Sequence, residues 1–314
     1  MSDGSVVALA GGVGAARFLT GLTHVLAPER IFIISNTADD AEIHGLHISP
    51  DLDTVTYTLA DLADPKRGWG IRGDRFRCLE ALGRLGAETW FQLGDQDLAT
   101  HLYRTQRLRQ GATLSEITQE IRTALGVRSR IVPMSNDRIR TRICTSAGEL
   151  EFQTYFVKRR ARDLVASVRF DGASDAAPAP GVIEAIADAE AIILCPSNPF
   201  ISIEPILAVR GVREALRSKR NRVTAISPIV GGRALKGPAA QMMKSMRLRP
   251  AAIEVARLYA DFAGVFVLDE VDQKQAALVE KLGMRAIVTN TVMRNLQKKK
   301  ALARVVAREL EIEA

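Results

Sequence analysis

The stretch Val6-Val7-Ala8-Leu9-Ala10-Gly11-Gly12-Val13-Gly14-Ala15-Ala16-Arg17 decides the fold of this chain. Its first five residues are all apolar, which predicts a buried β-strand at 6–10. The glycines predict a tight turn at 11–14 that leads into a helix starting near Ala15. The free N–H groups and positive dipole end of such a helix attract phosphate, although a purely structural turn is the alternative. Arg17 stands where a dinucleotide-binding turn would have its third glycine, and no Gly-Lys-Ser/Thr follows, so neither common nucleotide motif is complete.

The composition is that of an ordinary globular protein, with 314 residues, 47% hydrophobic and 25% charged. No run of about 18 apolar residues occurs, and no basic segment precedes the first strand. We therefore expect a cytoplasmic protein with no membrane partner. Cys78, Cys144 and Cys195 are widely spaced and form no Cys-x-x-Cys pair, which argues against a disulfide framework or a zinc site.

The formal net charge of +7 raises the question of nucleic-acid binding. The basic residues are scattered, with short runs at 158–162, 217–222 and 298–300, and aromatic residues make up only 5% of the chain. The sequence has no helix-turn-helix, zinc-finger or aromatic RNA-binding signature. Phosphorylated small substrates explain a moderate positive field equally well, so we expect no nucleic-acid partner.

Short apolar runs alternate with helical patterns along the chain. The predicted strands are 6–10, 31–35, 131–133, 192–195, 222–226 and 265–268. The predicted helices are 16–26, 74–85, 114–125, 180–187, 203–207, 212–219, 251–260, 272–282 and 291–310. This alternation predicts a doubly wound, mainly parallel, Rossmann-like α/β sheet whose ligands gather at the carboxyl ends of the strands.

The middle of the chain departs from this alternation. Residues 141–155 alternate apolar and polar side chains around a turn at Ser146-Ala147-Gly148-Glu149, which predicts a β-hairpin. No linker or internal repeat divides the sequence. We therefore expect one domain over 1–314, with 74–174 as an inserted subdomain of helices and a β-hairpin.

Acidic residues follow the predicted strand at 31–35. The segment 36–40 ends in Asp39 and Asp40, and 49–54 contains Asp51 and Asp53. Carboxylates beside a phosphate-binding turn suit Mg²⁺, although Asp39 or Asp40 and Asp51 could instead be helix N-caps. The segment 92–101, interpreted as following a strand, likewise places an acidic residue, Asp95, beside a glycine. Its lone His101 is more typical of a histidine with a structural hydrogen bond than of a catalytic base. The metal candidates are Asp39, Asp40 and Asp95.

Two later strands are also followed by polar loops. Cys195-Pro196-Ser197-Asn198-Pro199 follows the strand at 192–195, and Ser227-Pro228-Ile229-Val230-Gly231-Gly232 follows the strand at 222–226. Ser197 and Asn198 offer hydrogen bonds to a ribose or a polar heterocycle, and the prolines restrict the loops. In a doubly wound sheet most of these loops would open onto one edge, which predicts a ligand cleft there.

Together these segments resemble the 2-phospho-L-lactate transferase family of deazaflavin coenzyme F-420 biosynthesis. The motifs that carry the resemblance are AGGVG (10–14), NTADD (36–40), SPDLDT (49–54), WGI (69–71), LGDQD (93–97), PMSND (133–137), PSNP (196–199) and SPIVG (227–231). The resemblance implies transfer of a phospho-hydroxyacid from its guanosine diphosphate-activated form to the ribityl 5′-hydroxyl of the deazaflavin Fo. GMP would be released, and Mg²⁺ would be the cofactor.

The resemblance also implies roles for individual residues. Asp53 matches the acidic residue that contacts Fo and would orient or deprotonate the attacking hydroxyl. Gln92 falls at a second Fo-contacting position, where relatives can carry a lysine. The diphosphate and guanosine are assigned to Gly11, Gly12, Val13, Gly14, Ser197, Asn198 and Pro199. Alanine at Asp53 is expected to abolish transfer while leaving the fold intact.

Several alternatives stay open at this point. A non-catalytic nucleotide-sugar-binding regulator of the related YvcK type shares similar glycine loops. The transferred acid is 2-phospho-L-lactate, phosphoenolpyruvate or 3-phosphoglycerate, and residues 134–142 and 158–162 are candidates to face its carboxylate. The apolar face of the helix at 291–310 suits its own sheet or a neighbouring subunit, so a homodimer is one expectation.

Overall fold

A seven-stranded sheet with the order β14-β13-β10-β9-β1-β2-β5 forms the centre of the computed structural model, which describes residues 4–312. Every neighbouring pair in this sheet is parallel. The strands are β1 (Val6–Ala10), β2 (Ile31–Ser35), β5 (Arg130–Pro133), β9 (Ala191–Leu194), β10 (Val223–Ile226), β13 (Val265–Asp269) and β14 (Arg285–Thr289).

The chain winds outward from β1 in both directions. It passes from β1 to β2 and β5, crosses to β9 on the other side of β1, and continues through β10, β13 and β14. Val6 is therefore the register partner both of Ile31 in β2 and of Ala191 in β9. Ligands bind outside the carboxyl ends of the strands at such a switch point. The predicted doubly wound, mainly parallel α/β sheet is confirmed.

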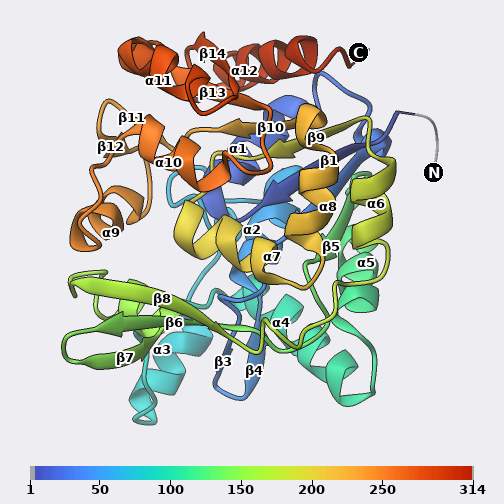
Figure 1. Cartoon of the computed structure of the whole chain (residues 1–314). Helices are drawn as coiled ribbons and strands as arrows, with labels where there is room; N and C mark the ends of the chain where they lie inside the picture. The colour runs from blue at the N-terminus through green and yellow to red at the C-terminus, as the bar shows by residue number, and fades with distance from the viewer. Residues whose placement is uncertain (1–3, 313–314) are drawn as a thin grey trace.

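Helices cover both faces of the sheet (Figure 1). Successive side chains of a strand point to opposite faces. Val6 and Ala8 of β1 accordingly share one apolar core with Phe18 of α1 and Val306 of α12, while Val7 and Leu9 belong to a second core on the other face. The helices are α1 (Gly12–Leu22), α2 (Pro50–Leu59), α3 (Arg77–Arg84), α4 (Asp95–Arg109), α5 (Leu114–Ala124), α6 (Val182–Asp188), α7 (Glu204–Ala208), α8 (Val212–Ser218), α9 (Ala239–Ser245), α10 (Ala252–Tyr259), α11 (Ala276–Glu280) and α12 (Leu296–Glu309).

Short elements complete the fold below the main sheet in Figure 1 and at its edges. A three-stranded antiparallel sheet has the order β7-β6-β8, and two small hairpins pair β3 with β4 and β11 with β12. The bounds are β3 (Ala41–Ile43), β4 (Leu46–Ile48), β6 (Arg140–Thr145), β7 (Gly148–Glu151), β8 (Val165–Asp171), β11 (Ile229–Val230) and β12 (Arg233–Ala234). Single turns of 3₁₀-helix lie at Pro28–Arg30, Arg220–Arg222 and Glu270–Gln275, and π-helical turns lie at Thr154–Lys158 and Pro199–Ile203.

The segment 74–174 is not one continuous insertion. The hairpin predicted at 141–155 is present as β6 and β7, and β8 joins it as a third strand that the sequence analysis did not predict. Within the same segment, β5 returns to the main sheet and pairs with β2. The main sheet and the smaller sheet are therefore interleaved along the chain.

Three further expectations need correction. Helix α1 begins at Gly12 rather than near Ala15, so the glycines form its first turn. No strand lies directly before Gln92, because residues 87–94 are irregular and lead straight into α4. Strand β14 was not predicted; as an edge strand it has partly exposed residues in place of the fully buried run of β13.

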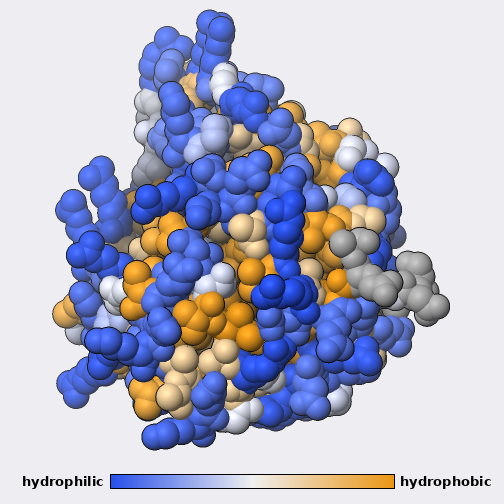
Figure 2. Space-filling model, turned by 90° about the horizontal axis from the view of Figure 1, so that it is seen from above, coloured by the Kyte–Doolittle hydropathy of each residue, from blue (hydrophilic) through white to orange (hydrophobic). Residues whose placement is uncertain are grey.

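The C-terminal helix α12 buries its apolar face within its own chain. Leu302 and Val306 are buried in the core that contains α1. Near the β14 edge, Leu278, Val288 and Leu296 remain exposed. In the view from above, hydrophobic residues on the surface are interrupted by hydrophilic ones (Figure 2). The apolar face that motivated the homodimer is thus already covered, and the homodimer stays a prediction. None of the helices in residues 4–312 is long and apolar enough to cross a membrane.

Candidate active site

A cavity of about 520 Å³ lies at the carboxyl ends of the strands around β1 and β9. Residues that follow β1, β2, β9 and β10 line it, as the sequence analysis expected. The smaller sheet contributes a further wall through Phe152 and Phe156. The lining consists of Asp39, Thr291, Met293 and residues within 11–17, 48–57, 67–70, 91–101, 152–157, 196–202 and 227–239.

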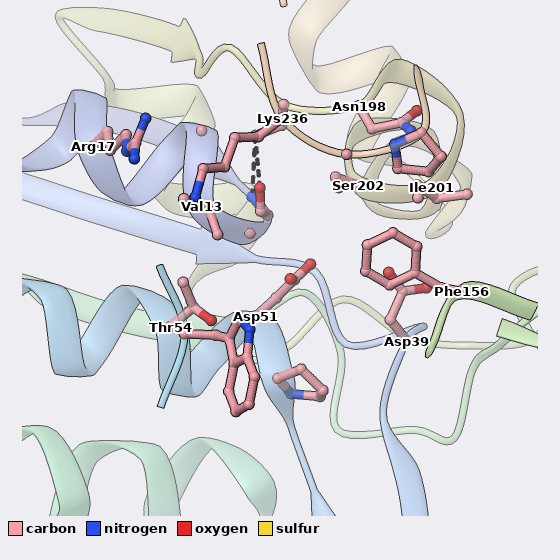
Figure 3. Close-up of a pocket in the computed structure, with 18 of the residues that line it drawn as sticks. Val13, Arg17, Asp39, Asp51, Thr54, Phe156, Asn198, Ile201, Ser202 and Lys236 are labelled. Carbon is pink, nitrogen blue, oxygen red and sulfur yellow. Dashed lines mark hydrogen bonds between the residues drawn. The ribbon is translucent and has the colours of Figure 1, made fainter. Parts of the chain in front are cut away.

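The first turn of α1 opens into this cavity (Figure 3). The N-cap Gly11 provides no side-chain cap, and the Gly12 N–H already donates to the Asp51 carboxylate, so the N–H groups that follow in the first turn remain available to an anion. The Ser197 hydroxyl donates to the Gly11 carbonyl at 2.9 Å and accepts from the Gly11 N–H at 3.4 Å, which ties the turn after β1 to the loop after β9. A Cβ at residue 14 would lie 2.2 Å from the backbone oxygen of Pro196, so only glycine permits this close approach.

The other predicted nucleotide residues lie beside this turn. Asn198 lines the cavity, while its Oδ1 accepts from the Phe200 N–H at 3.0 Å and caps the π-helical turn that follows. Pro199 is the first residue of that turn and is buried outside the cavity lining. Its contribution is therefore to the shape of the loop.

Two carboxylates, Asp39 and Asp51, face the cavity (Figure 3). Asn36 Nδ2 donates to Asp51 Oδ2 at 2.9 Å, whereas Asp39 Oδ1 is buried with no hydrogen-bond partner. Burial, and then the charge of Asp51, raise the pKa of Asp39 well above its ordinary value. Burial raises the pKa of Asp51 to about 7, against the opposing effect of its hydrogen bond from Asn36. A buried carboxylate and a half-buried one near it are thus arranged to receive a cation or a proton.

The remaining metal candidates do not join this pair. Asp40 Oδ2 accepts from His47 Nε2 at 2.9 Å and from the Ser49 hydroxyl at 2.7 Å, and the residue does not line the cavity. Asp95 accepts from the N–H groups of Arg77 and Cys78 at the start of α3, also outside the lining. Across residues 4–312 no group of three or more His, Cys, Asp or Glu side chains is placed to hold a metal.

Asp53 lines the cavity and is paired with a buried arginine behind the wall. Arg104 donates to both carboxylate oxygens of Asp53, through Nη1 at 3.1 Å to Oδ2 and through Nη2 to Oδ1. Only 2% of Arg104 and 6% of Asp53 are exposed. Burial raises the pKa of Asp53, and the charge of Arg104 opposes this effect. With both oxygens already accepting hydrogen bonds, Asp53 is better suited to orienting a hydroxyl than to removing its proton.

The ion pair belongs to a larger buried network. His101 Nδ1 lies 3.8 Å from Asp53 Oδ2, and His101 Nε2 lies 3.2 Å from Asp97 Oδ1. The Tyr57 hydroxyl donates to the same oxygen of Asp97 at 2.8 Å. Removing the Asp53 side chain would leave the Arg104 charge buried without its partner. Alanine at this position is therefore expected to lower stability as well as transfer.

Aromatic side chains form the remaining walls of the cavity. Trp69, Phe91, Phe152 and Phe156 line it, and the rings of Phe152 and Phe156 are stacked with centroids 5.4 Å apart. Gln92 lies among them, exposed, with its Nε2 donating to the Thr89 carbonyl at 3.1 Å. The cavity thus combines an anion-binding helix end, a carboxylate pair and flat apolar walls.

The family model of 2-phospho-L-lactate transferase CofD matches residues 6–309. The chain belongs to the CofD family. It is 39% identical over 301 residues to a 2-phospho-L-lactate transferase of Methanosarcina mazei, covering 96% of this chain and 99% of that protein. It is also 39% identical over 305 residues to a phosphoenolpyruvate transferase of Streptomyces griseus, covering 95% and 96% respectively. The chain is therefore a transferase enzyme, and the non-catalytic alternative is not supported.

A crystal structure of a UPF0052 family protein from Bacillus halodurans has the same fold. Its TM-score is 0.62 at 17% sequence identity, with 98% of this chain and 99% of that chain covered. At this identity the similarity concerns the fold alone.

The CofD-family cavity includes residues that sequence reasoning missed. Asp51 was weighed as a Mg²⁺ ligand or a helix N-cap and was left out of the final metal candidates, but it lies in the first turn of α2 and faces the cavity. Arg104 could have been found from its spacing, because Asp97, His101 and Arg104 fall at i, i+4 and i+7 on one face of α4. Neither 134–142 nor 158–162 contributes to the lining. The cavity's lysine and arginine side chains are instead Arg17, Arg67 and Lys236.

Proposed function

We propose that this CofD-family transferase moves a phospho-acid from a guanosine diphosphate-activated donor to the ribityl 5′-hydroxyl of Fo and releases GMP. The observation that carries the proposal is the meeting of three features in one cavity of about 520 Å³. These are the uncapped first turn of α1, the Asp39–Asp51 pair and the aromatic walls. They suit a diphosphate, a divalent cation and a flat heterocycle in that order.

The diphosphate is assigned to the first turn of α1. Gly12 leaves the backbone open to it, while Gly11 and Gly14 hold the turn against Ser202 and Pro196. The helix dipole stabilises its negative charge. The guanosine side is assigned to the loop at 196–199, where Asn198 faces the cavity. Developing charge on the departing GMP phosphate is then stabilised by groups already in place, which is the main requirement of phosphoryl transfer.

Fo is assigned to the aromatic side of the cavity. Trp69 and Phe91 offer faces on which a deazaflavin ring can stack, and Gln92 lies beside them. Asp53, held by Arg104, accepts the hydrogen bond of the attacking 5′-hydroxyl and orients it towards the phosphorus.

Mg²⁺ is the proposed cofactor. Asp39 and Asp51 fit it, because both are hard oxygen donors and Oδ1 of Asp39 is buried with no partner. Mg²⁺ is commonly held by one or two carboxylates together with substrate phosphates, so two protein ligands suffice. When bound there, the ion would neutralise charge on the diphosphate.

The decisive test is a mass-spectrometric transfer assay with purified protein, Mg²⁺ and Fo. The guanosine diphosphate derivatives of lactate, enolpyruvate and glycerate, corresponding to the three candidate acids, are supplied separately. We expect one of them to give GMP and a phosphodiester-linked product, which also identifies the acid. GDP binding without product from any of the three would contradict the proposal.

Gly14→Ala is expected to weaken GDP binding about tenfold or more, because the new methyl group must displace the turn of α1 from Pro196. Isothermal titration calorimetry with GDP measures the change. Gly83→Ala is the matched control, since its Cβ would meet only the side-chain methyl of Thr89 at 3.1 Å, and α3 tolerates alanine. Unchanged GDP affinity in Gly14→Ala would contradict the assignment of the diphosphate to the first turn of α1.

A further inference from the structure

Positive charge gathers at one end of the cavity. Arg17 on α1 and Lys236 after β12 both line the cavity. Figure 3 places them on the same side as Val13, away from Asn198 and Asp39. In the sequence, Arg17 stood out only because it replaces the third glycine of a dinucleotide-binding turn. Neither residue has a role in the proposed function above.

These two cations lack an acidic partner. In the described part of the chain, no carboxylate lies within ion-pair distance of Arg17 or Lys236, and Lys236 Nζ donates only to the Arg67 carbonyl at 3.4 Å. Arg67, the third cation of the lining, differs, because it lies 3.8 Å from Asp64 and over the ring of Trp69 at 5.6 Å. The Arg17–Lys236 pair is thus the uncompensated positive charge of the cavity.

The two cations also act on each other. Burial, and then the charge of Arg17, lower the pKa of Lys236. Like charges held near each other are unfavourable until an anion lies between them. The arrangement is therefore complementary to a negatively charged group at this end of the cavity.

The chemistry of the donor identifies that group. With the diphosphate at the first turn of α1 and Fo on the aromatic side of the cavity, the guanine and the ribose of the donor carry no further full negative charge. The carboxylate of the transferred acid is what remains. We propose that Arg17 and Lys236 form the carboxylate subsite of the donor, an inference that rests on the proposed function. A planar guanidinium suits paired hydrogen bonds to a carboxylate, and an ammonium adds a second charge.

This assignment replaces the earlier candidates 134–142 and 158–162, which lie outside the cavity lining. Lactate, enolpyruvate and glycerate donors all carry a carboxylate. The subsite therefore imposes a requirement for an acid, and the choice among the three acids rests on other contacts.

Two probes test the inference by calorimetry without Fo. One is the guanosine diphosphate derivative of lactate, and the other is the ethyl ester of GDP, which differs from it only by lacking the carboxylate. We expect Arg17→Gln and Lys236→Gln each to weaken binding of the lactate derivative about tenfold, and binding of the ethyl ester by less than about threefold. The preference of the wild-type protein for the lactate derivative should largely disappear in the double variant.

Lys299→Gln is the matched control. Lys299 is another cation near Arg17. Burial, and to a smaller extent the charge of Arg17, lower the pKa of Lys299, but this residue does not line the cavity. We expect it to leave both affinities unchanged. Equal losses for both probes in Arg17→Gln and Lys236→Gln would overturn the inference, since the cations would then serve the diphosphate. If the wild-type protein bound the two probes equally well and still catalysed transfer, the carboxylate subsite would be wrong and the proposed function would stand. If it bound neither probe, both the subsite and the proposed function would be wrong.

Discussion

Arg104→Met is expected to lower the free energy of unfolding by about 3–5 kcal/mol, because it leaves the Asp53 carboxylate buried without its partner. Methionine keeps much of the aliphatic volume of the arginine, so the effect reports the lost charge rather than a cavity. Urea unfolding followed by circular dichroism measures it. The same variant should lose transfer activity, since Asp53 is no longer held at the cavity wall.

The double variant Asp53→Asn/Arg104→Met separates charge from shape. Removing both charges together should restore most of the lost stability, since replacing a whole buried ion pair by neutral groups is often close to neutral. Transfer activity should stay low in the stable double variant, which would show that Asp53 acts on the substrate and does more than support the fold. A double variant as unstable as the sum of the two single variants would show that the pair is not coupled.

The central sheet could be predicted because parallel strands covered on both faces carry continuous apolar runs. Val6–Ala10 and Ile31–Ser35 are such runs, and they were predicted with the bounds that the structure has. Edge strands follow a weaker rule. In β14, Arg285 and Val288 are exposed and the other three residues are half-buried, so its sequence carries no comparable signal.

The sequence predicted where the candidate site lies better than it predicted which residues face it. Strand ends in a doubly wound sheet meet at one edge, so the loops after β1 and β9 could be brought together from sequence alone. The direction of an individual carboxylate could not, because it depends on local turns. Asp39 and Asp40 are neighbours in sequence, yet the first faces the cavity and the second is hydrogen-bonded to His47 and Ser49 outside it.

The sequence pattern did not indicate that aromatic side chains line the cavity. Phe152 directly follows β7 and Phe156 lies in the π-helical turn after it, and they reach the cavity only because the smaller sheet packs beside the main one. Such contacts between segments far apart in sequence are set by tertiary packing.

Asp51→Asn is expected to reduce the turnover of the transfer reaction by about 10²-fold or more, because the variant keeps the shape of the side chain and removes half of the carboxylate pair. Calorimetric titration with Mg²⁺ in the presence of GDP provides a readout that does not depend on turnover, and the affinity for the ion should fall with the activity. Asp61→Asn is the matched control. The Asp61 side chain is 94% exposed outside the cavity, and asparagine tolerates its positive φ of 55°.

The same variant should change how stability depends on pH. The pKa of Asp51 is raised from 3.8 to about 7 in the folded protein, so between these values the folded state binds a proton that the unfolded state has released. Its contribution therefore makes the wild-type protein less stable as pH rises from about 4 to about 7, and it is constant above that range. Asp51→Asn lacks this contribution, so its stability relative to the wild-type protein should increase with pH across the window, while Asp61→Asn should follow the wild-type curve. If the free energy of unfolding of Asp51→Asn and of the wild-type protein changed with pH in parallel, the pKa of Asp51 would not be raised in the folded protein. Normal turnover of the variant would show in addition that the Asp51 carboxylate takes no part in the reaction.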